Sequence, residues 1–275
     1  MSTRILTVVI AWLVLPVALA LGQQTPVASP LPAATQSQAD CTGFIRASDV
    51  PANITVLSGE DNDLESSIRQ YAVGDSLYLH SRGDARFSVG QQFSLIRPAK
   101  ELFRTTRYSG EHRALRKLGK PYEDTGRVQV TQVTPQGAVA EVRFACGPII
   151  PGDIAVPYQP RIVPDYVPRE LDRFALANSK MQGAIVAARD NFASLASGDI
   201  VYLDLGKRNG AKAGQLYRVY YRPPRPGLWT ITAHPPMPRE TVAEIVVLSA
   251  QEKSTVGIIV NSRRDVYIGY GVELE

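Results

Sequence analysis

Apolar residues along this chain gather in short runs, separated by polar stretches that contain Gly, Asn and Pro. One run, Ile200–Leu205, ends at Gly206 and is followed by an Asn209-Gly210 turn signal. Short runs rich in β-branched and aromatic residues between such breaks are typical of β-strands. The pattern predicts strands at residues 76–79, 92–96, 127–133, 138–144 and 154–156, and again at 200–205, 216–221, 244–249, 254–260 and 266–274.

The two sets of strands are copies of one another. Residues 74–79 (GDSLYL) recur at 198–203 (GDIVYL), and 89–93 (VGQQF) recur at 213–217 (AGQLY), both at an offset of 124. Residues 125–130 (TGRVQV) resemble 242–247 (VAEIVV) at an offset of 117. Upstream, residues 43–45 (GFI) match 183–185 (GAI) at an offset of 140, which indicates an insertion in the first copy.

Five or six short strands per copy are too few for a large sandwich but are enough to close a small barrel. We therefore predict an all-β protein of two tandem small β-barrel domains, each with five to six short strands and with minor helical insertions. One such helix is expected within 63–71, where Leu64, Ile68 and Tyr71 share a helical face, and another at about 169–179.

Glycines precede the equivalent strands in both copies. We interpret them as structural residues of a bend or bulge, because no Gly-rich cluster or Lys-Ser/Thr pair follows that would bind phosphate. Asp75 and Asp199 follow two of them and are expected to bond their own turn backbone. The structural glycines are Gly74, Gly90, Gly198 and Gly214.

The N-terminus has the pattern of an export signal: Arg4, the apolar run Ile5–Leu21 and a small-residue cleavage site at Ala18-Leu19-Ala20. An uncleaved membrane anchor is the alternative, and membrane contact is expected through this segment in that case alone. No Cys follows the run, so we expect a periplasmic or extracellular protein that is not a lipoprotein. The predicted organisation is a signal peptide at 1–22, a flexible tether at 23–40, a first barrel at 41–158, a Pro-rich linker at 159–180 and a second barrel at 181–275.

The chain has two cysteines, Cys41 and Cys146, and an even count in an exported chain predicts a disulfide. The bond would join the beginning of the first copy to its end. The formal net charge of +4 is modest, and acidic and basic residues are interleaved, so the sequence predicts no nucleic-acid partner.

Catalytic and metal-binding patterns are absent from the sequence. The three histidines, His80, His112 and His234, have no second ligand at zinc spacing, and no Gly-x-Ser-x-Gly elbow occurs. The surroundings of Cys146 do not match those of a transpeptidase nucleophile. The sequence therefore predicts a protein that is not an enzyme and that uses no metal or cofactor.

Two divergent loops are the candidate partner-binding regions, since loops on a rigid scaffold commonly carry specificity. The first is an aromatic and arginine group of the type enriched at binding hot spots. Its alternative is that the tyrosines face the barrel core or its rim and that Trp229 covers a barrel end. The second is a basic stretch suited to an anionic envelope polymer, and its alternative is an ordinary solvated loop or helical turn. The groups are Tyr220, Tyr221, Arg222 and Trp229, and Arg113, Arg116 and Lys117.

Several strings of this chain resemble one known module. They are residues 198–206 (GDIVYLDLG), 209–214 (NGAKAG), 243–247 (AEIVV), 253–259 (KSTVGII), 118–122 (LGKPY) and 150–153 (IPGD). They resemble the C-terminal β-domain of flagellar assembly protein T and the related module of LysM-containing envelope proteins. The resemblance covers most of residues 43–275, although Gly269-Tyr270 stands where the family has a late Gly-Asp, and the chain contains no LysM segment.

The resemblance implies a periplasmic, non-catalytic module. We expect an envelope protein that acts as a protein-interaction or scaffold module in a periplasmic assembly, as in flagellar assembly. The alternative is a module that binds peptidoglycan or another cell-wall glycan.

Overall fold

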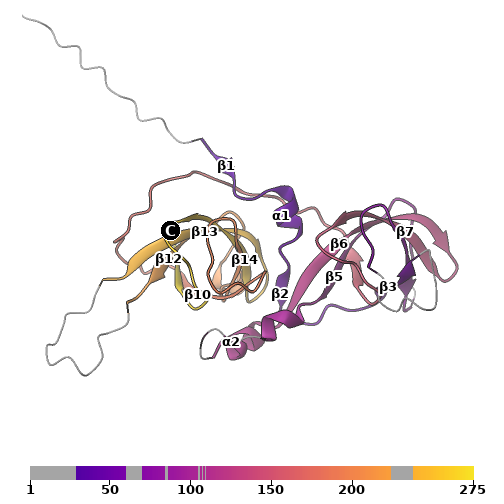
Figure 1. The fold of residues 1–275 in the computed structure, drawn as a ribbon, viewed down its shortest axis with the longest axis horizontal. Coiled ribbons are helices and arrows are strands. Elements are labelled where there is room, and N and C mark those ends of the chain that lie inside the picture. Colours follow the sequence, from indigo (N-terminus) through magenta and orange to yellow (C-terminus); the bar gives the residue numbers. More distant parts are fainter. Residues whose placement is uncertain are drawn as a thin grey trace, which may run out of the picture.

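The computed structural model describes residues 29–59, 70–83, 86–104, 106, 108, 110–223 and 238–275, and it contains two closed six-stranded barrels set side by side (Figure 1). Barrel 1 consists of β3 (Ile54–Gly59), β4 (Ser76–Ser81), β5 (Gln92–Pro98), β6 (Lys120–Thr134), β7 (Gly137–Ala145) and β8 (Ile154–Pro157). Barrel 2 consists of β10 (Gln182–Ala188), β11 (Ile200–Leu203), β12 (Leu216–Tyr221), β13 (Glu240–Ala250), β14 (Thr255–Ser262) and β15 (Gly271–Leu274). The predicted fold class is confirmed.

The two barrels have the same strand order. Around barrel 2 the order is β10-β11-β14-β13-β12-β15, and around barrel 1 it is β3-β4-β7-β6-β5-β8, with β6 pairing β7 to close the ring. Equivalent residues also pair in the same register: Tyr78 faces Val139 in barrel 1, as Tyr202 faces Val256 in barrel 2. The duplication inferred from the sequence is therefore a duplication of the whole barrel topology.

The repeated turns explain why the glycines recur. The Asp75 carboxylate accepts a hydrogen bond from the Ala72 amide at 2.8 Å, and the Asp199 carboxylate accepts one from the Ala196 amide at 2.7 Å. The glycine before each aspartate has positive φ, 94° at Gly74 and 98° at Gly198, where a side chain is strained. Gly90 and Gly214 adopt positive φ in the equivalent turns before β5 and β12.

The upstream correspondence predicted from residues 43–45 is wrong. Residues Phe44–Arg46 form β2, which adds to the extended end of β6 outside the barrel. The strand equivalent to β10 is β3, because Val56 pairs with Leu79 as Ile185 pairs with Leu203. The similarity of residues 43–45 (GFI) to 183–185 (GAI) therefore does not reflect structural equivalence, and the equivalent strand, β3, has little sequence in common with β10.

Residues 29–40 are ordered, in contrast to the flexible tether expected there. They contain β1 (Leu31–Pro32) and α1 (Gln36–Asp40), and β1 pairs with β9 (Asp165–Tyr166). Thr35 caps α1 in a capping box with Gln38, and Ala39 is buried. We call residues 29–46 the arm; it runs between the barrels (Figure 1).

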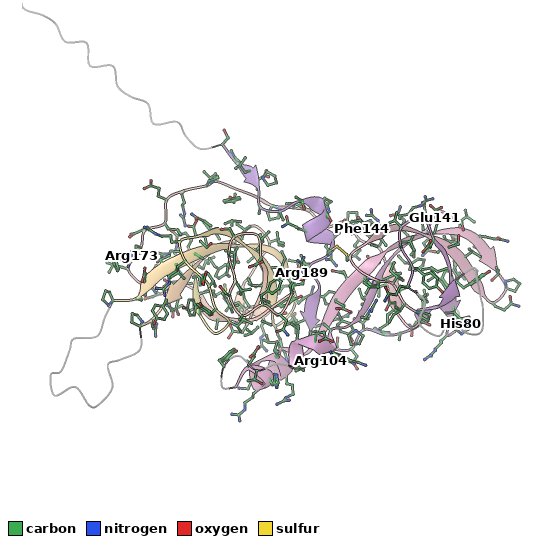
Figure 2. All side chains as sticks on the ribbon, in the orientation of Figure 1. His80, Arg104, Glu141, Phe144, Arg173 and Arg189 are labelled. Atoms are coloured by element: carbon green, nitrogen blue, oxygen red, sulfur yellow. A yellow bond between two sulfur atoms is a disulfide. The ribbon has the colours of Figure 1, made fainter. Side chains whose placement is uncertain are left out.

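The helix expected at 169–179 is absent, and that stretch runs over the outside of barrel 2 as irregular backbone with one turn at 173–174. We call residues 167–180 the strap. The Thr241 amide donates to the Arg173 carbonyl at 2.8 Å, and Asn178 donates from its side chain to the Leu274 carbonyl at 2.8 Å. These bonds to strand ends favour a non-helical backbone, so the linker covers barrel 2 rather than acting as a spacer. Figure 2 shows Arg173 on this outer surface, at the far side of barrel 2 from barrel 1.

Cys41 and Cys146 form the predicted disulfide, with a Cα–Cα distance of 5.5 Å. Cys41 follows α1 and Cys146 follows β7, so the bond fixes the arm to barrel 1. The helix predicted within 63–71 lies almost wholly outside the described residues; Tyr71 itself forms an isolated bridge with Ile149.

Candidate partner-binding surfaces

Barrel 2 has an outer wall that is buried against the rest of the chain. Its strands β10, β11 and β14 contribute Val186, Tyr202 and Val256, which are 1 %, 3 % and 0 % exposed. We call these three residues the covered wall. It packs with Ile45 of the arm and with the leucines of α2 (Glu111–Leu118) in one apolar cluster. Barrel 2 is therefore buried on this wall both inside and outside the barrel.

The equivalent wall of barrel 1 is open to solvent. In the repeat, Leu57, Tyr78 and Val139 occupy the positions of Val186, Tyr202 and Val256. Leu57 is 59 % exposed, Tyr78 is 36 % exposed, and Val139 on β7 is half-buried. We call these three residues the bare wall.

Polar residues surround the bare wall. On β7, the strand that also carries Val139, Glu141 forms an ion pair with Arg143, which donates to the Gln129 side chain on β6 at 3.1 Å. An apolar centre with a polar rim is the usual anatomy of a protein interface. The wall is therefore the best-formed candidate docking surface among the described residues.

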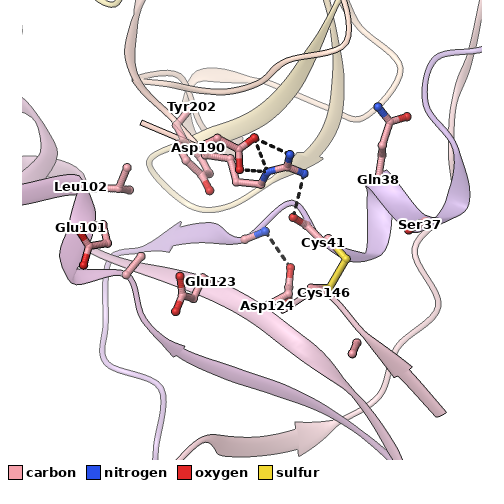
Figure 3. Close-up of a pocket in the computed structure, with 14 residues that line it drawn as sticks. Ser37, Gln38, Cys41, Glu101, Leu102, Glu123, Asp124, Cys146, Asp190 and Tyr202 are labelled. Carbon is pink, nitrogen blue, oxygen red and sulfur yellow. Dashed lines mark hydrogen bonds and ion pairs between the residues drawn. A yellow bond between two sulfur atoms is a disulfide. The ribbon is translucent and has the colours of Figure 1, made fainter. Parts of the chain in front are cut away.

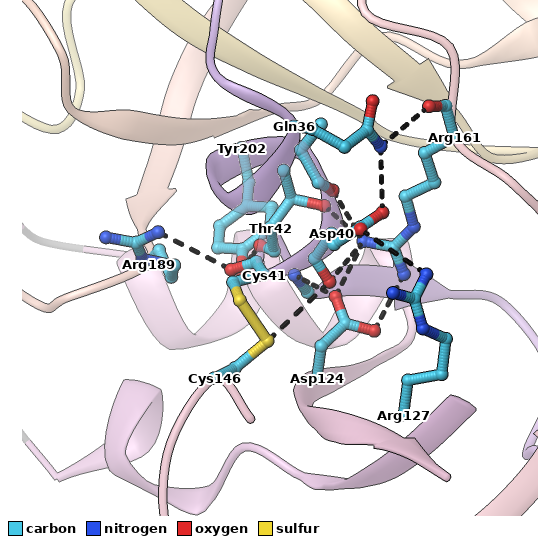
Figure 4. A network of polar contacts seen from close by, with 12 residues as sticks. Gln36, Asp40, Cys41, Thr42, Asp124, Arg127, Cys146, Arg161, Arg189 and Tyr202 are labelled. Carbon is cyan, nitrogen blue, oxygen red and sulfur yellow. Dashed lines mark hydrogen bonds and ion pairs between the residues drawn. A yellow bond between two sulfur atoms is a disulfide. The ribbon is translucent and has the colours of Figure 1, made fainter. Parts of the chain in front are cut away.

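A polar network fixes the arm between the barrels (Figure 4). Arg161 makes a bidentate ion pair with Asp124, with both N–O distances 2.7 Å, and also donates to the Ala39 carbonyl at 2.9 Å. The same Asp124 carboxylate accepts the Gly43 amide at 2.8 Å. Its side chain is 3 % exposed, so this pair lies in a setting where charge interactions are strong.

Barrel 2 contributes one buried hydrogen bond to this network. The Tyr202 hydroxyl donates to the Thr42 carbonyl at 2.8 Å. Burial raises the pKa of Tyr202 well above its ordinary value, and the nearby Asp124 charge raises it further. The hydroxyl therefore keeps its proton and remains a donor to the arm at any physiological pH. Ser254 makes a second bond of this kind, to the Ile45 carbonyl at 2.8 Å.

We call the region where the arm meets the two barrels the joint. A cavity of about 380 Å³ lies in this joint, beside the disulfide (Figure 3). Four carboxylates line it, and each forms an ion pair with an arginine, although the arginine that pairs with Glu123 lies closer to Asp153. The pairs are Glu101 with Arg104, Glu123 with Arg97, Asp124 with Arg161, and Asp190 with Arg189. Burial raises the pKa of Glu123, against the lowering effect of Arg97.

The two tyrosines of the predicted aromatic anchor differ in their surroundings. Tyr221 packs against the core of barrel 2 and lies 5.4 Å from Tyr270. Tyr220 is not part of that core: it is 9 % exposed, lies against Gly271 and has the Arg239 guanidinium 5.0 Å from its ring centre. Tyr221 therefore fits the alternative of a tyrosine that packs in the barrel, whereas Tyr220 is covered by arginine side chains.

Two further residues, which the sequence reasoning did not single out, belong with this cluster. Tyr267 is 40 % exposed and meets Tyr270 edge-to-face at 5.6 Å, while Arg264 lies 5.1 Å over the Tyr221 ring. The available signal was the pair of tyrosines in 267–270 (YIGY), close to two consecutive arginines. Arg222 lies over the Tyr220 ring at 5.2 Å, and Trp229 lies outside the described residues.

The predicted basic loop is largely helical. Within it, η1 (Lys100–Phe103) and α2 precede β6, and Leu115 and Leu118 bury one side of α2 against barrel 2. Arg113, Arg116 and Lys117 are exposed on the other side. Spacings of three and four residues place all three cations on one helical face.

The part of the chain that the structure describes contains no group of three or more His, Cys, Asp or Glu side chains arranged to hold a metal ion. Both cysteines are in the disulfide, so neither supplies a free thiol. None of the described helices has the length and apolar character needed to cross a membrane.

No protein-family model matches the chain, and no curated protein sequence matches it.

Proposed function

We propose that this protein is a non-catalytic envelope scaffold that binds a protein partner on the bare wall of barrel 1. The observation that carries the proposal is that two equivalent walls differ in burial. The covered wall is occupied by an arm and an amphipathic helix of the same chain, whereas Leu57 and Tyr78 are left exposed. A partner that presents a similar apolar helix or strand would bury the bare wall in the same way.

The joint supports a scaffold role in particular. The disulfide, the Arg161–Asp124 pair and the Tyr202 hydroxyl all hold the same short arm between the barrels. Two barrels held through one fixed segment present their surfaces at a constant separation. The resemblance to assembly modules of the periplasm and the export-like N-terminus agree with such a role in the cell envelope.

The test is site-specific crosslinking in cells. A photo-reactive phenylalanine analogue at Tyr78 is expected to capture one specific envelope protein, and the same analogue at Val89, an exposed position of barrel 1 outside the wall, is expected to capture none. Leu57→Asp should abolish the adduct, while Val89→Asp should leave it unchanged. Equal capture from both positions would contradict a defined docking surface.

A second experiment tests glycan binding, which the exposed Tyr267 and the arginine-rich barrel end favour as a second candidate. Purified protein would be incubated with isolated peptidoglycan sacculi and sedimented. Co-sedimentation that is lost in Tyr267→Ala, together with no protein adduct from Tyr78, would favour the glycan function over the scaffold.

A further inference from the structure

Helix α2 presents three exposed cations that the fold does not use. Arg113, Arg116 and Lys117 lie on its solvent side, and no described carboxylate is within ion-pair distance of any of them. Neighbouring cations are paired: Arg104 with Glu101 at 2.8 Å and Lys120 with Asp49 at 3.3 Å. The three charges on α2 are therefore available to an anionic partner.

The opposite face of α2 is already occupied. Leu115 and Leu118 are 0 % and 5 % exposed, because they cover barrel 2. The helix thus has no apolar face to insert into lipid, as an interfacial amphipathic helix would. Any contact made by its outer face is a contact between surface charges, and such contacts weaken as salt screens them.

The position of α2 suits a broad, flat partner. Figure 1 shows the helix at the lower edge of the molecule, below the region where the barrels meet, and Figure 2 shows Arg104 at the same edge. The outer face carries arginine and lysine without an exposed aromatic residue of the helix. A sugar polymer is usually held by ring stacking or in a groove, whereas a layer of phosphate headgroups needs only accessible cations.

We infer that the outer face of α2 docks the protein onto an anionic phospholipid surface. This inference goes beyond the proposed scaffold function, and it assigns membrane contact to the folded part of the chain, whether or not the N-terminal segment is removed. Arg113, Arg116 and Lys117 approach the headgroup phosphates, while the leucines of the same helix stay in the protein. The bare wall of barrel 1 is not required for this contact.

The experiment is vesicle co-sedimentation of the full chain after its N-terminal segment, residues 1–22, has been removed. Vesicles of phosphatidylglycerol and phosphatidylcholine are expected to bind the protein at low salt, and vesicles of phosphatidylcholine alone are not. Each cation near an anionic surface contributes roughly a fivefold gain in affinity. Arg113→Glu/Arg116→Glu should therefore weaken binding at least about 20-fold.

A matched control separates this site from net charge. Arg82→Glu/Arg86→Glu replaces two exposed arginines of barrel 1, and each double variant lowers the formal net charge by four. The control should retain most of the affinity. The milder Arg113→Gln/Arg116→Gln variant removes charge without reversing it. It should weaken binding by about 20-fold while keeping the melting temperature of the parent.

The outcomes separate the inference from the proposed function. Equal loss in the α2 variant and in the control, or no binding to phosphatidylglycerol vesicles, would overturn membrane docking. Binding of isolated sacculi but not of vesicles would also overturn it. Crosslinking from Tyr78 is expected to persist in the α2 variants if the scaffold proposal is correct. The two proposals can therefore fail independently, and the experiments show which one has failed.

Discussion

Tyr78 and Tyr202 occupy the same position in the two barrels and have opposite environments. Tyr78 is 36 % exposed on the wall of barrel 1, whereas Tyr202 is 3 % exposed and hydrogen-bonded to the arm. The strands, their order and their turns are the same. The difference arises from the segments added between and around the barrels, and these segments decide which surfaces remain for partners.

The disulfide is the strongest single restraint on the segment that covers barrel 2. Replacing both cysteines in Cys41→Ser/Cys146→Ser removes a link across 105 residues, for which chain entropy predicts a loss of about 4–5 kcal/mol in the free energy of unfolding. Urea unfolding followed by circular dichroism measures the loss. Reductant should destabilise the parent and leave the variant unchanged; insensitivity of the parent would show that the arm is held without the bond.

The ion pair in the joint provides the next largest contrast. Arg161→Gln leaves the buried Asp124 carboxylate without its partner, and such a loss typically costs about 3 kcal/mol. The matched variant is Arg143→Gln, which breaks the exposed pair with Glu141 on barrel 1 and should change stability by less than about 1 kcal/mol. Equal losses of stability in denaturant titrations would mean that the ion pair in the joint contributes no more to folding than the exposed pair.

The tyrosine pair tests the comparison most directly. Tyr202→Phe removes a buried donor and leaves the Thr42 carbonyl unsatisfied, which costs about 1–3 kcal/mol. Tyr78→Phe removes an exposed hydroxyl and should stay within about 0.5 kcal/mol of the parent. A thermal unfolding series on the two variants measures both values. A large effect at Tyr78 would mean that the bare wall is already covered in solution.

The strands and turns were predictable because their signals are local. The run Ser76-Leu77-Tyr78-Leu79 alternates polar and apolar residues as a one-sided strand does, and Gly74 and Asp75 specify the turn before it. The equivalent run 200–203 is apolar throughout, which is typical of burial on both faces. This difference between the two runs indicated that the second strand is covered on its outer face as well. Assigning strands alone does not make use of that signal.

The arm and the strap were not predictable in the same way, because their order depends on distant contacts. The arm has low hydrophobicity, yet Arg161 and Asp124 fix it from far along the chain. Thr35 and Gln38 form a capping box that was readable in the sequence as a helix start. The strap is not helical because its partners are strand ends of barrel 2, which composition cannot reveal.

The smallest expected effect concerns a glutamate that barrel 2 alone possesses. Glu273 in β15 is fully buried, and Val156 occupies the equivalent position in barrel 1. Burial by itself would raise the pKa of Glu273, but the hydrogen bonds from Arg239 and from the Asn178 amide outweigh it and hold the pKa below the ordinary value of 4.5. The unfolded chain therefore takes up this proton first on acidification. The stabilisation is complete above pH 4.5 and is lost as the pH falls through the lowered pKa of the folded state.

Glu273→Gln should accordingly destabilise the protein most at neutral pH, and its difference from the parent should shrink as the solution is acidified below pH 4.5. Denaturant titrations at a series of pH values measure this difference directly. Val156→Ala in barrel 1 is the control, because it removes packing without a titrating group and its cost should not depend on pH. The losses of stability in Glu273→Gln and in Val156→Ala could instead depend on pH in the same way. The ion pair of Glu273 with Arg239 would then not stabilise barrel 2, and the outer surface of that barrel would depend on the backbone contacts of the strap.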